Sequence, residues 1–293
     1  MPNDDAVQTD SSVARFIPAE FLELLEKTDL TTIEKGDFIE KEMALMFTDI
    51  RNFTGLSEGM TAADTFRFLN SYLSRMNPSI ENYGGFVDKF IGDEIMALFP
   101  DAENALKAAI EMRIELRVYN SHRRNQGYAP IDTGMGLHFG RLMLGTVGSE
   151  KRLQMTVVGD TVNLASRIER LTKVFRTPFL LTDAVYKRLK NPESYLLREL
   201  DSVIVRGKKQ PIVLYESFDF DPLPIQEKKS AYLAEYQVAL FQYKAGNFSE
   251  ARSLFAACAA RCPEDNIPPL YLSRCDYLME NPPKRWTGIS RIK

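Results

Sequence analysis

The chain has 293 residues, of which 44% are hydrophobic, and a formal net charge of -3. This length is enough to bury a sizeable core in one large domain or two smaller ones. The charge argues against a general nucleic-acid-binding protein, because such proteins usually carry a strongly basic face. With only two histidines, a His-based triad or a His-rich zinc site is disfavoured, so any chemistry must come from carboxylates, Lys, Arg and the backbone.

The N-terminal region is polar and lacks the apolar core of a signal peptide, and we expect residues 1–15 to be disordered. A short amphipathic helix is predicted over Phe16–Leu30, with Pro18 near its start. It belongs to an upstream segment, residues 16–42, which continues as a charged connector. No run of 18 apolar residues occurs, so we expect no membrane span and a cytoplasmic protein.

The middle of the chain, residues 43–218, alternates short apolar runs with longer helical patterns. A buried strand is predicted over Met43–Phe47, and glycines end the next helix. The other predicted elements are a helix at Thr61–Tyr83, a hairpin of Phe86–Ile91 and Glu94–Phe99, a helix at Ala102–Asn125, a hairpin of Gly134–Gly140 and Leu142–Val147, a strand at Leu153–Val158, a helix at Thr161–Leu171, a strand at Phe179–Leu181, a helix at Asp183–Leu189, and strands at Tyr195–Val205 and Ile212–Phe218. This order predicts an α+β fold, with helices against one face of a mostly antiparallel sheet.

The C-terminal region reads differently, because only helical patterns follow a proline-containing linker at residues 219–225. Residues 226–293 fit most of one tetratricopeptide-type repeat. One repeat cannot bury its own apolar face, so we predict a small all-α appendage that either covers its own domain or makes a partner or dimer contact. The three cysteines all lie in this tail, and they are expected to be buried thiols rather than a metal site.

Two aspartates stand where chemistry is expected. Asp49 follows the first apolar run, and Asp93 lies in the turn of the first predicted hairpin. Carboxylates brought together by neighbouring strands suit Mg²⁺ or Mn²⁺, which prefer oxygen ligands. Each aspartate taken alone would more often be a turn or cap residue.

Three motifs around these residues decide the interpretation. The runs Phe47–Thr54, Lys89–Glu94 and Gly159–Ile168 resemble, in the same order, the two metal motifs and the transition-state motif of class III adenylate and guanylate cyclases. The resemblance extends over roughly Phe16 to Phe218. Three ordered motifs over this length are far more specific than any one of them.

The resemblance implies a ferredoxin-like sheet and conversion of ATP to cyclic AMP and pyrophosphate. It implies that Asp49, Asp93 and the carbonyl of Ile50 hold two Mg²⁺ or Mn²⁺ ions, an arrangement that suits in-line displacement at phosphorus. The implied triphosphate ligands are the backbone of Asn52, Phe53, Thr54 and Gly55, together with Arg141 and Lys208, where Lys209 could replace Lys208. The implied catalytic pair is Asn163, which orients the ribose, and Arg167, which contacts the α-phosphate.

The choice of base rests on Lys89 and Thr156, which occupy the two base-reading positions of the resembled family. A lysine only donates hydrogen bonds, which suits the acceptor N1 of adenine, and a threonine hydroxyl can accept from the adenine amino group. Guanine would point its N1–H donor at the lysine. The pair therefore predicts ATP, although threonine stands where aspartate is commoner.

In the resembled family the metal aspartates come from one subunit, and the base-reading and transition-state residues come from the other. This chain carries both sets, so we expect a head-to-tail homodimer with two equivalent sites. A guanylate cyclase is disfavoured by Lys89, and a diguanylate cyclase by the absence of a Gly-Gly-Asp/Glu-Glu-Phe string. A catalytically silent nucleotide sensor or scaffold is the alternative from another class, and the presence of Asp49, Asp93, Asn163 and Arg167 argues against it.

Overall fold

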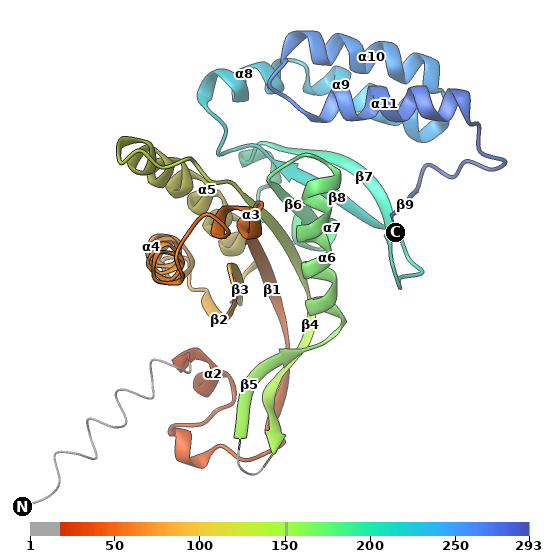
Figure 1. The fold of residues 1–293 in the computed structure, drawn as a ribbon. Helices are drawn as coiled ribbons and strands as arrows, with labels where there is room; N and C mark the ends of the chain where they lie inside the picture. Colours follow the sequence, from red (N-terminus) through yellow and green to blue (C-terminus); the bar gives the residue numbers. More distant parts are fainter. Residues whose placement is uncertain (1–17, 150–151, 293) are drawn as a thin grey trace, which may run out of the picture.

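The computed structural model describes residues 18–149 and 152–292. It shows an α+β fold, in which helices cover a twisted sheet and a group of helices follows at the C-terminal end (Figure 1). The disorder predicted for residues 1–15 falls outside the described residues. In the described ranges, no helix has an apolar stretch of the length that a bilayer crossing requires.

Nine strands of the described residues form one sheet in the order β2-β3-β1-β4-β6-β8-β7-β9, with β5 paired to β4. Neighbouring strands are antiparallel, except for the parallel pairs β4–β6 and β7–β9. The strands are β1 Phe38–Ile50, β2 Phe86–Ile91, β3 Glu94–Phe99, β4 Thr133–Ser149, β5 Arg152–Val158, β6 Phe179–Thr182, β7 Leu197–Val205, β8 Ile212–Ser217 and β9 Ser290–Ile292. The predicted antiparallel sheet is therefore present.

The helices lie on both faces of this sheet rather than on the one face predicted, because both faces of its central strand are apolar and need cover (Figure 1). They are α2 Ala19–Leu24, α3 Phe53–Ser57, α4 Ala62–Glu81, α5 Ala102–Asn125, α6 Asp160–Val174, α7 Asp183–Tyr186, α8 Leu223–Ala231, α9 Leu233–Ala245, α10 Phe248–Arg261 and α11 Ile267–Glu280. Side chains cap the two longest: Thr61 accepts from the backbone N–H of Asp64, and Asp101 from that of Asn104.

The central strand β1 has a continuous apolar run because both of its faces are covered. Ala44 and Met46 pack in one core with α4 and α5. Met43, Leu45 and Phe47 point the other way, into a core shared with α2 and α6. Successive side chains of a strand alternate between faces, so a strand with two covered faces reads as uniformly hydrophobic.

The hairpin predicted from Gly134–Gly140 and Leu142–Val147 is wrong, because β4 is one uninterrupted strand. It pairs with β1 without a break, from Phe38 opposite Gly145 to Ile50 opposite Thr133. Gly140 is not a turn residue. A Cβ built there would lie 2.7 Å from the hydroxyl oxygen of Thr161, so this glycine lets α6 approach the strand closely.

The N-terminal prediction also needs correction. The helix expected over Phe16–Leu30 is limited to α2, which is followed by a 3₁₀ turn at Leu30–Thr32, and Phe16 itself lies outside the described residues. The charged connector is partly strand, since β1 begins at Phe38 rather than Met43. Its first residues are held by pairing with β4, a hydrogen-bonding partner that hydrophobic patterning does not reveal.

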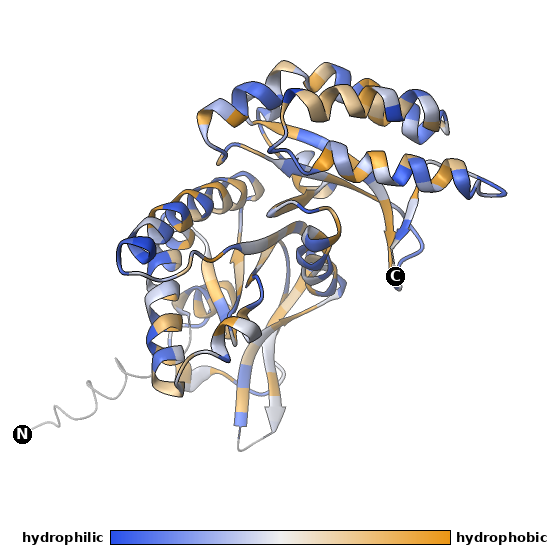
Figure 2. Ribbon diagram, turned by 45° about the horizontal axis from the view of Figure 1, so that its top comes forward, coloured by the Kyte–Doolittle hydropathy of each residue, from blue (hydrophilic) through white to orange (hydrophobic). Residues whose placement is uncertain are grey.

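The C-terminal helices α8 to α11 pack on the β7 and β8 side of the sheet, and their residues alternate between hydrophobic and hydrophilic (Figure 2). Tyr232, Tyr236, Phe255 and Tyr271 share one buried cluster with Leu200 of β7 and its neighbours. After α11 the chain returns to the sheet as β9. Helix α8 begins at Leu223, inside the segment expected to be a linker. The tail thus covers its own sheet, and the exact domain division stays a prediction.

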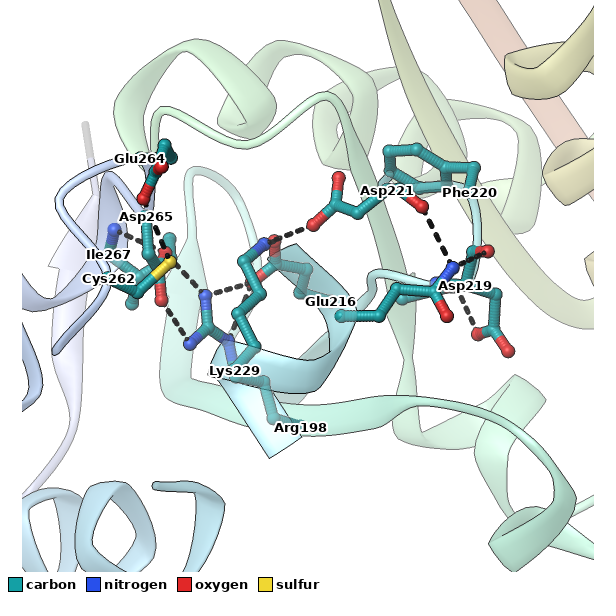
Figure 3. A network of polar contacts seen from close by, with 12 residues as sticks. Arg198, Glu216, Asp219, Phe220, Asp221, Lys229, Cys262, Glu264, Asp265 and Ile267 are labelled. Carbon is teal, nitrogen blue, oxygen red and sulfur yellow. Dashed lines mark hydrogen bonds and ion pairs between the residues drawn. The ribbon is translucent and has the colours of Figure 1, made fainter. Parts of the chain in front are cut away.

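A buried ion cluster joins this tail to the sheet (Figure 3). The Arg198 guanidinium, from β7, lies 2.6 Å from carboxylate oxygens of Glu216 in β8 and of Asp265 between α10 and α11. The Lys229 ammonium, from α8, lies 3.3 Å from Glu216 and 2.7 Å from Asp221. Burial alone would raise the pKa of Asp265, but the Arg198 guanidinium outweighs it and lowers that pKa to about 2.

We predict that Arg198→Met will destabilise the folded chain by about 3–5 kcal/mol, because it leaves two carboxylates buried beside an apolar side chain. The matched control is Arg252→Met. Arg252 pairs with Asp276 on the surface at 2.5 Å, and such exposed pairs contribute less than about 1 kcal/mol. Urea unfolding measures both free energies, and equal losses in the two variants would contradict a structural role for the buried cluster.

Candidate active site

The structure brings Asp49 and Asp93 together. Asp49 lies near the end of β1, and Asp93 lies in the β2–β3 turn, which is carried to the same place because β3 pairs with β1. The backbone N–H of Ile50 donates to a carboxylate oxygen of Asp93 at 3.2 Å. Burial, followed by the nearby Asp49 carboxylate, raises the pKa of Asp93 to about 6. Two carboxylates that repel each other in a half-buried place are the usual setting of a cation site.

Two further carboxylates, which sequence reasoning missed, lie close to this pair. Burial, and then the charge of Asp49, raises the pKa of Glu94 to about 7. Burial and Asp49 likewise raise the pKa of Glu169, a buried residue of α6. Glu94 could have been found, since it directly follows Asp93 in the chain. Glu169 has no motif signal, because only packing of α6 on the sheet brings it here.

A divalent ion fits this donor set. The oxygens of Asp49 and Asp93 and the carbonyl of Ile50 are hard ligands of the kind that Mg²⁺ and Mn²⁺ select. Among the described residues no group of three His, Cys, Asp or Glu side chains has the spacing of a complete metal cage. Such a site would need oxygens from a substrate to complete it, as magnesium sites shared with phosphates do.

The loop expected to bind phosphate, residues 52–55, follows β1 directly. Asn52 adopts a left-handed conformation, with φ of 54°, and α3 starts at Phe53. A Cβ on Gly55 would lie 2.8 Å from the Asn52 side-chain nitrogen, so the loop closes tightly against its own first residue. Residues 52–55 therefore stand three to six positions beyond Asp49, at the same end of β1.

The two expected base-reading residues also meet. Lys89 comes from β2 and Thr156 from β5, and the ammonium donates to the threonine hydroxyl at 2.5 Å. The two strands are not neighbours in the sheet, so only the tertiary structure shows this contact. The Lys89 side chain retains a 25% exposed fraction.

The transition-state pair lies on α6, one turn apart. Arg167 donates to the carbonyl of Arg206 in the β7–β8 turn at 2.5 Å, and Asn163 lies 3.5 Å from the carbonyl of Gly159. Lys208, in the same turn, is ion-paired with Asp160 at the start of α6. The structure thus brings Arg167 and Lys208 to one place.

Arg141 is the one expected phosphate ligand that stands apart. Its guanidinium is exposed and lies 3.3 Å from the Glu40 carboxylate, across the β1–β4 ladder. Its carbonyl accepts from the Thr161 hydroxyl at 2.6 Å, which fixes the backbone but not the side chain. In this structure its side chain therefore contacts β1 and not the β7–β8 turn, through an exposed ion pair of the kind that exchanges partners readily.

Within one chain, the face of α6 that lies nearest Asp49 is different from the face that carries Arg167. Asp49 lies 3.6 Å from the ammonium of Lys173, near the end of this helix. Lys173 follows Arg167 by six residues, which places the two side chains about 120° apart around a helix of 3.6 residues per turn. Arg167 therefore leaves α6 on a different face from the one nearest Asp49.

Exposed apolar residues lie close to the two base-reading residues in the sequence and along the β4–β5 ladder. Phe90 and Ile91, which follow Lys89, are about half exposed. Val147, Leu153 and Val158, on β4 and β5 beside Thr156, are 47%, 39% and 55% exposed. A group of exposed apolar residues around one site is typical of a protein–protein contact.

Comparisons with known proteins agree with this geometry. Residues 39–216 match the family model of the adenylate and guanylate cyclase catalytic domain. An adenylate cyclase of Dictyostelium discoideum described as terminal-differentiation specific is 36% identical over 273 residues, which are 91% of this chain and 13% of that protein. The Anabaena cylindrica adenylate cyclase is 44% identical over 216 residues, 71% of this chain and 43% of that protein. The chain thus spans less than half of either relative.

Solved structures give the same match. The adenylyl cyclase CyaB from P. aeruginosa superposes with a TM-score of 0.56 at 31% identity, over 61% of this chain and 95% of that one. A bacterial light-regulated adenylyl cyclase gives a TM-score of 0.64 at 26% identity, over 74% and 62% of the two chains. The guanylyl cyclase Cya2 gives 0.53 at 28% identity, over 61% and 92%.

We predict that Gly136→Ala will displace α6 from β4. A Cβ at Gly136 would lie 2.2 Å from the backbone nitrogen of Glu169, and a helix backbone cannot move aside as a side chain can. We expect a loss of about 1–3 kcal/mol in unfolding free energy, as overpacking usually causes. Gly59→Ala is the control, because its nearest atom lies at 3.8 Å. Thermal unfolding decides, and equal melting temperatures for the two variants would show that α6 does not depend on this contact.

Proposed function

The chain belongs to the adenylate and guanylate cyclase catalytic domain family, and on this premise we propose that it converts ATP to 3′,5′-cyclic AMP and pyrophosphate. The observation that carries the choice of ATP is the contact between Lys89 and Thr156. The lysine offers donors to the acceptor N1 of adenine, and the threonine oxygen can accept from the amino group. Guanine presents a donor at N1, so the same pair disfavours GTP.

The proposed reaction is the attack of the ribose 3′-oxygen on the α-phosphorus, with pyrophosphate leaving in line. Asp49, Asp93 and the carbonyl of Ile50 would hold two Mg²⁺ or Mn²⁺ ions. Bound there, such ions would lower the pKa of the ribose hydroxyl and neutralise the phosphates. No protein base is then obligatory.

The chain's own residues would do the positioning. Asn163 would orient the ribose, and Arg167 would stabilise charge on the α-phosphate, an effect worth about 10³–10⁵ in rate for the comparable arginine of GTPases. Lys208 and Arg141 would bind the triphosphate, together with the backbone of Asn52–Gly55. Lys208 is ion-paired with Asp160 and Arg167 is hydrogen-bonded to Arg206, so both must exchange partners when substrate binds.

We further propose that the working unit is a head-to-tail homodimer. Arg167 leaves α6 on a different face from the one nearest Asp49, so the two halves of the chemistry do not face each other within one chain. The exposed apolar residues of β2, β4 and β5 supply the contact surface. A partner protein for the helical tail stays a prediction.

The direct test is incubation of the purified chain with ATP or GTP and Mn²⁺ or Mg²⁺, with both cyclic nucleotides quantified. We expect cyclic AMP from ATP, little cyclic GMP, and neither product from Asp93→Ala. Cyclic GMP as the main product would keep the reaction and overturn the adenine assignment. No product under any condition, with nucleotide still bound, would favour the silent sensor or scaffold.

A mixing experiment tests the shared site. Asp93→Ala and Arg167→Ala should each be inactive alone, and chains mixed in equal amounts should recover about a quarter of wild-type activity. Half of the dimers are then mixed, and one of their two sites combines both intact halves. The control mixes Asp93→Ala with Asp49→Ala, two defects in the same half, which should recover nothing. Absence of recovery in the first mixture would place each site within one chain.

A further inference from the structure

Strand β2 contains an irregularity beside the base-reading lysine. Val87 pairs with Ala97 and Lys89 with Met96, so Asp88 has no residue opposite it on β3. This is a β-bulge, a feature that inserts one residue, twists the strand and re-aims a side chain, often next to a functional site. The side chains of neighbouring residues in a regular strand point to opposite faces, but here Asp88 and Lys89 contact each other.

The Asp88 carboxylate is in an unfavourable place for a charge. Its side chain is 0% exposed, and among the described residues neither of its oxygens accepts a hydrogen bond of good geometry. The nearest cation is the Lys89 ammonium, 3.2 Å from one carboxylate oxygen. Burial raises the pKa of Asp88 and the Lys89 charge opposes this shift. A carboxylate buried with so little compensation destabilises a fold, so its presence calls for a role beyond stability.

The Lys89 ammonium stands between two acceptors from different parts of the chain. Asp88 lies on one side at 3.2 Å, and the Thr156 hydroxyl lies on another at 2.5 Å. An ammonium group has three donors and a flexible stem, so a single partner would leave its position poorly defined. The hydrogen bond to Thr156 and the ion pair with Asp88 together restrict its position, and the ammonium keeps N–H donors for a ligand.

We propose that Asp88 is a positioning residue for base selection, which acts through Lys89 by holding its ammonium where it can donate to an adenine. The proposal rests on the proposed adenylate cyclase function and names a residue of its specificity. With Asp88 in place, the ammonium cannot swing away from an approaching guanine, whose N1–H would face it. By holding the Lys89 ammonium in place, Asp88 therefore favours adenine and disfavours guanine. It supplies a carboxylate near the base, which the resembled family more often has at the position of Thr156.

The test is Asp88→Asn, which keeps the shape of the side chain and removes its charge. We expect the ratio of kcat/KM for ATP to that for GTP to fall by at least about tenfold, because loss of the Asp88 charge releases the ammonium from its ion pair. The free energy of unfolding should stay unchanged or rise, because a desolvated charge is removed. Asp276→Asn, which breaks the exposed pair with Arg252, is the control and should leave the ratio unchanged.

A double-mutant cycle separates positioning from a general structural effect. In a Lys89→Gln background, Asp88→Asn should change the ATP-to-GTP ratio no further, because the group that it positions is gone. The proposal is overturned if Asp88→Asn leaves the ratio unchanged in the wild-type background, or lowers it equally in both backgrounds. A drop in stability together with proportionate losses for ATP and GTP would likewise reduce Asp88 to a structural residue.

The wild type, Asp88→Asn, Lys89→Gln and the double variant are also titrated calorimetrically with ATP and with GTP. These binding measurements distinguish this inference from the proposed function. If the wild-type chain binds ATP more tightly than GTP but makes no cyclic nucleotide, the proposed catalysis fails, and the binding ratio still tests Asp88. A wild-type chain that binds both nucleotides equally overturns the base assignment and this inference with it.

Discussion

The antiparallel ladder between β1 and β4 positions the rest of the molecule. The two strands stay in register from Phe38 opposite Gly145 to Ile50 opposite Thr133. Because the ladder is long and uninterrupted, its one end presents Asp49 and the loop that follows it. Its other end also carries β5 and Thr156, with α2 beside it (Figure 1). One hydrogen-bonded ladder thus holds the proposed catalytic end and the end that carries Thr156 at a fixed distance.

Close approach of α6 to this ladder is the second constraint. Gly136 and Gly140 have no side chain where α6 crosses β4, and a Cβ at either would fall within 3 Å of atoms on α6. The helix can therefore lie against the strand, with Arg167 directed to the β7–β8 turn and Glu169 directed to the acidic group. Glycine is needed here for the distance between two elements rather than for a turn.

Buried charge appears in two forms with different consequences. The Arg198 guanidinium is ion-paired and hydrogen-bonded to both Glu216 and Asp265, and the cluster joins the tail to the sheet (Figure 3). Around Asp88 the carboxylate has one cation and no good hydrogen bond. Satisfied clusters define how elements dock, while a poorly satisfied charge beside a binding residue is better explained by what it does to that residue.

The sequence by itself determined the α+β class, most strands and helices, and the family, because apolar periodicity and the three ordered motifs are local signals. It also singled out Asp49, Asp93, Lys89 and Thr156. It mistook Gly140 for a turn and could not place Glu169, because packing at a distance decides both. Only the tertiary structure showed that the tail covers its own sheet, since docking of α8 to α11 depends on pairings between Arg198 and residues far along the chain. The bulge at Asp88 is likewise visible only in the tertiary structure, because strand register is a property of two strands and cannot be read from one.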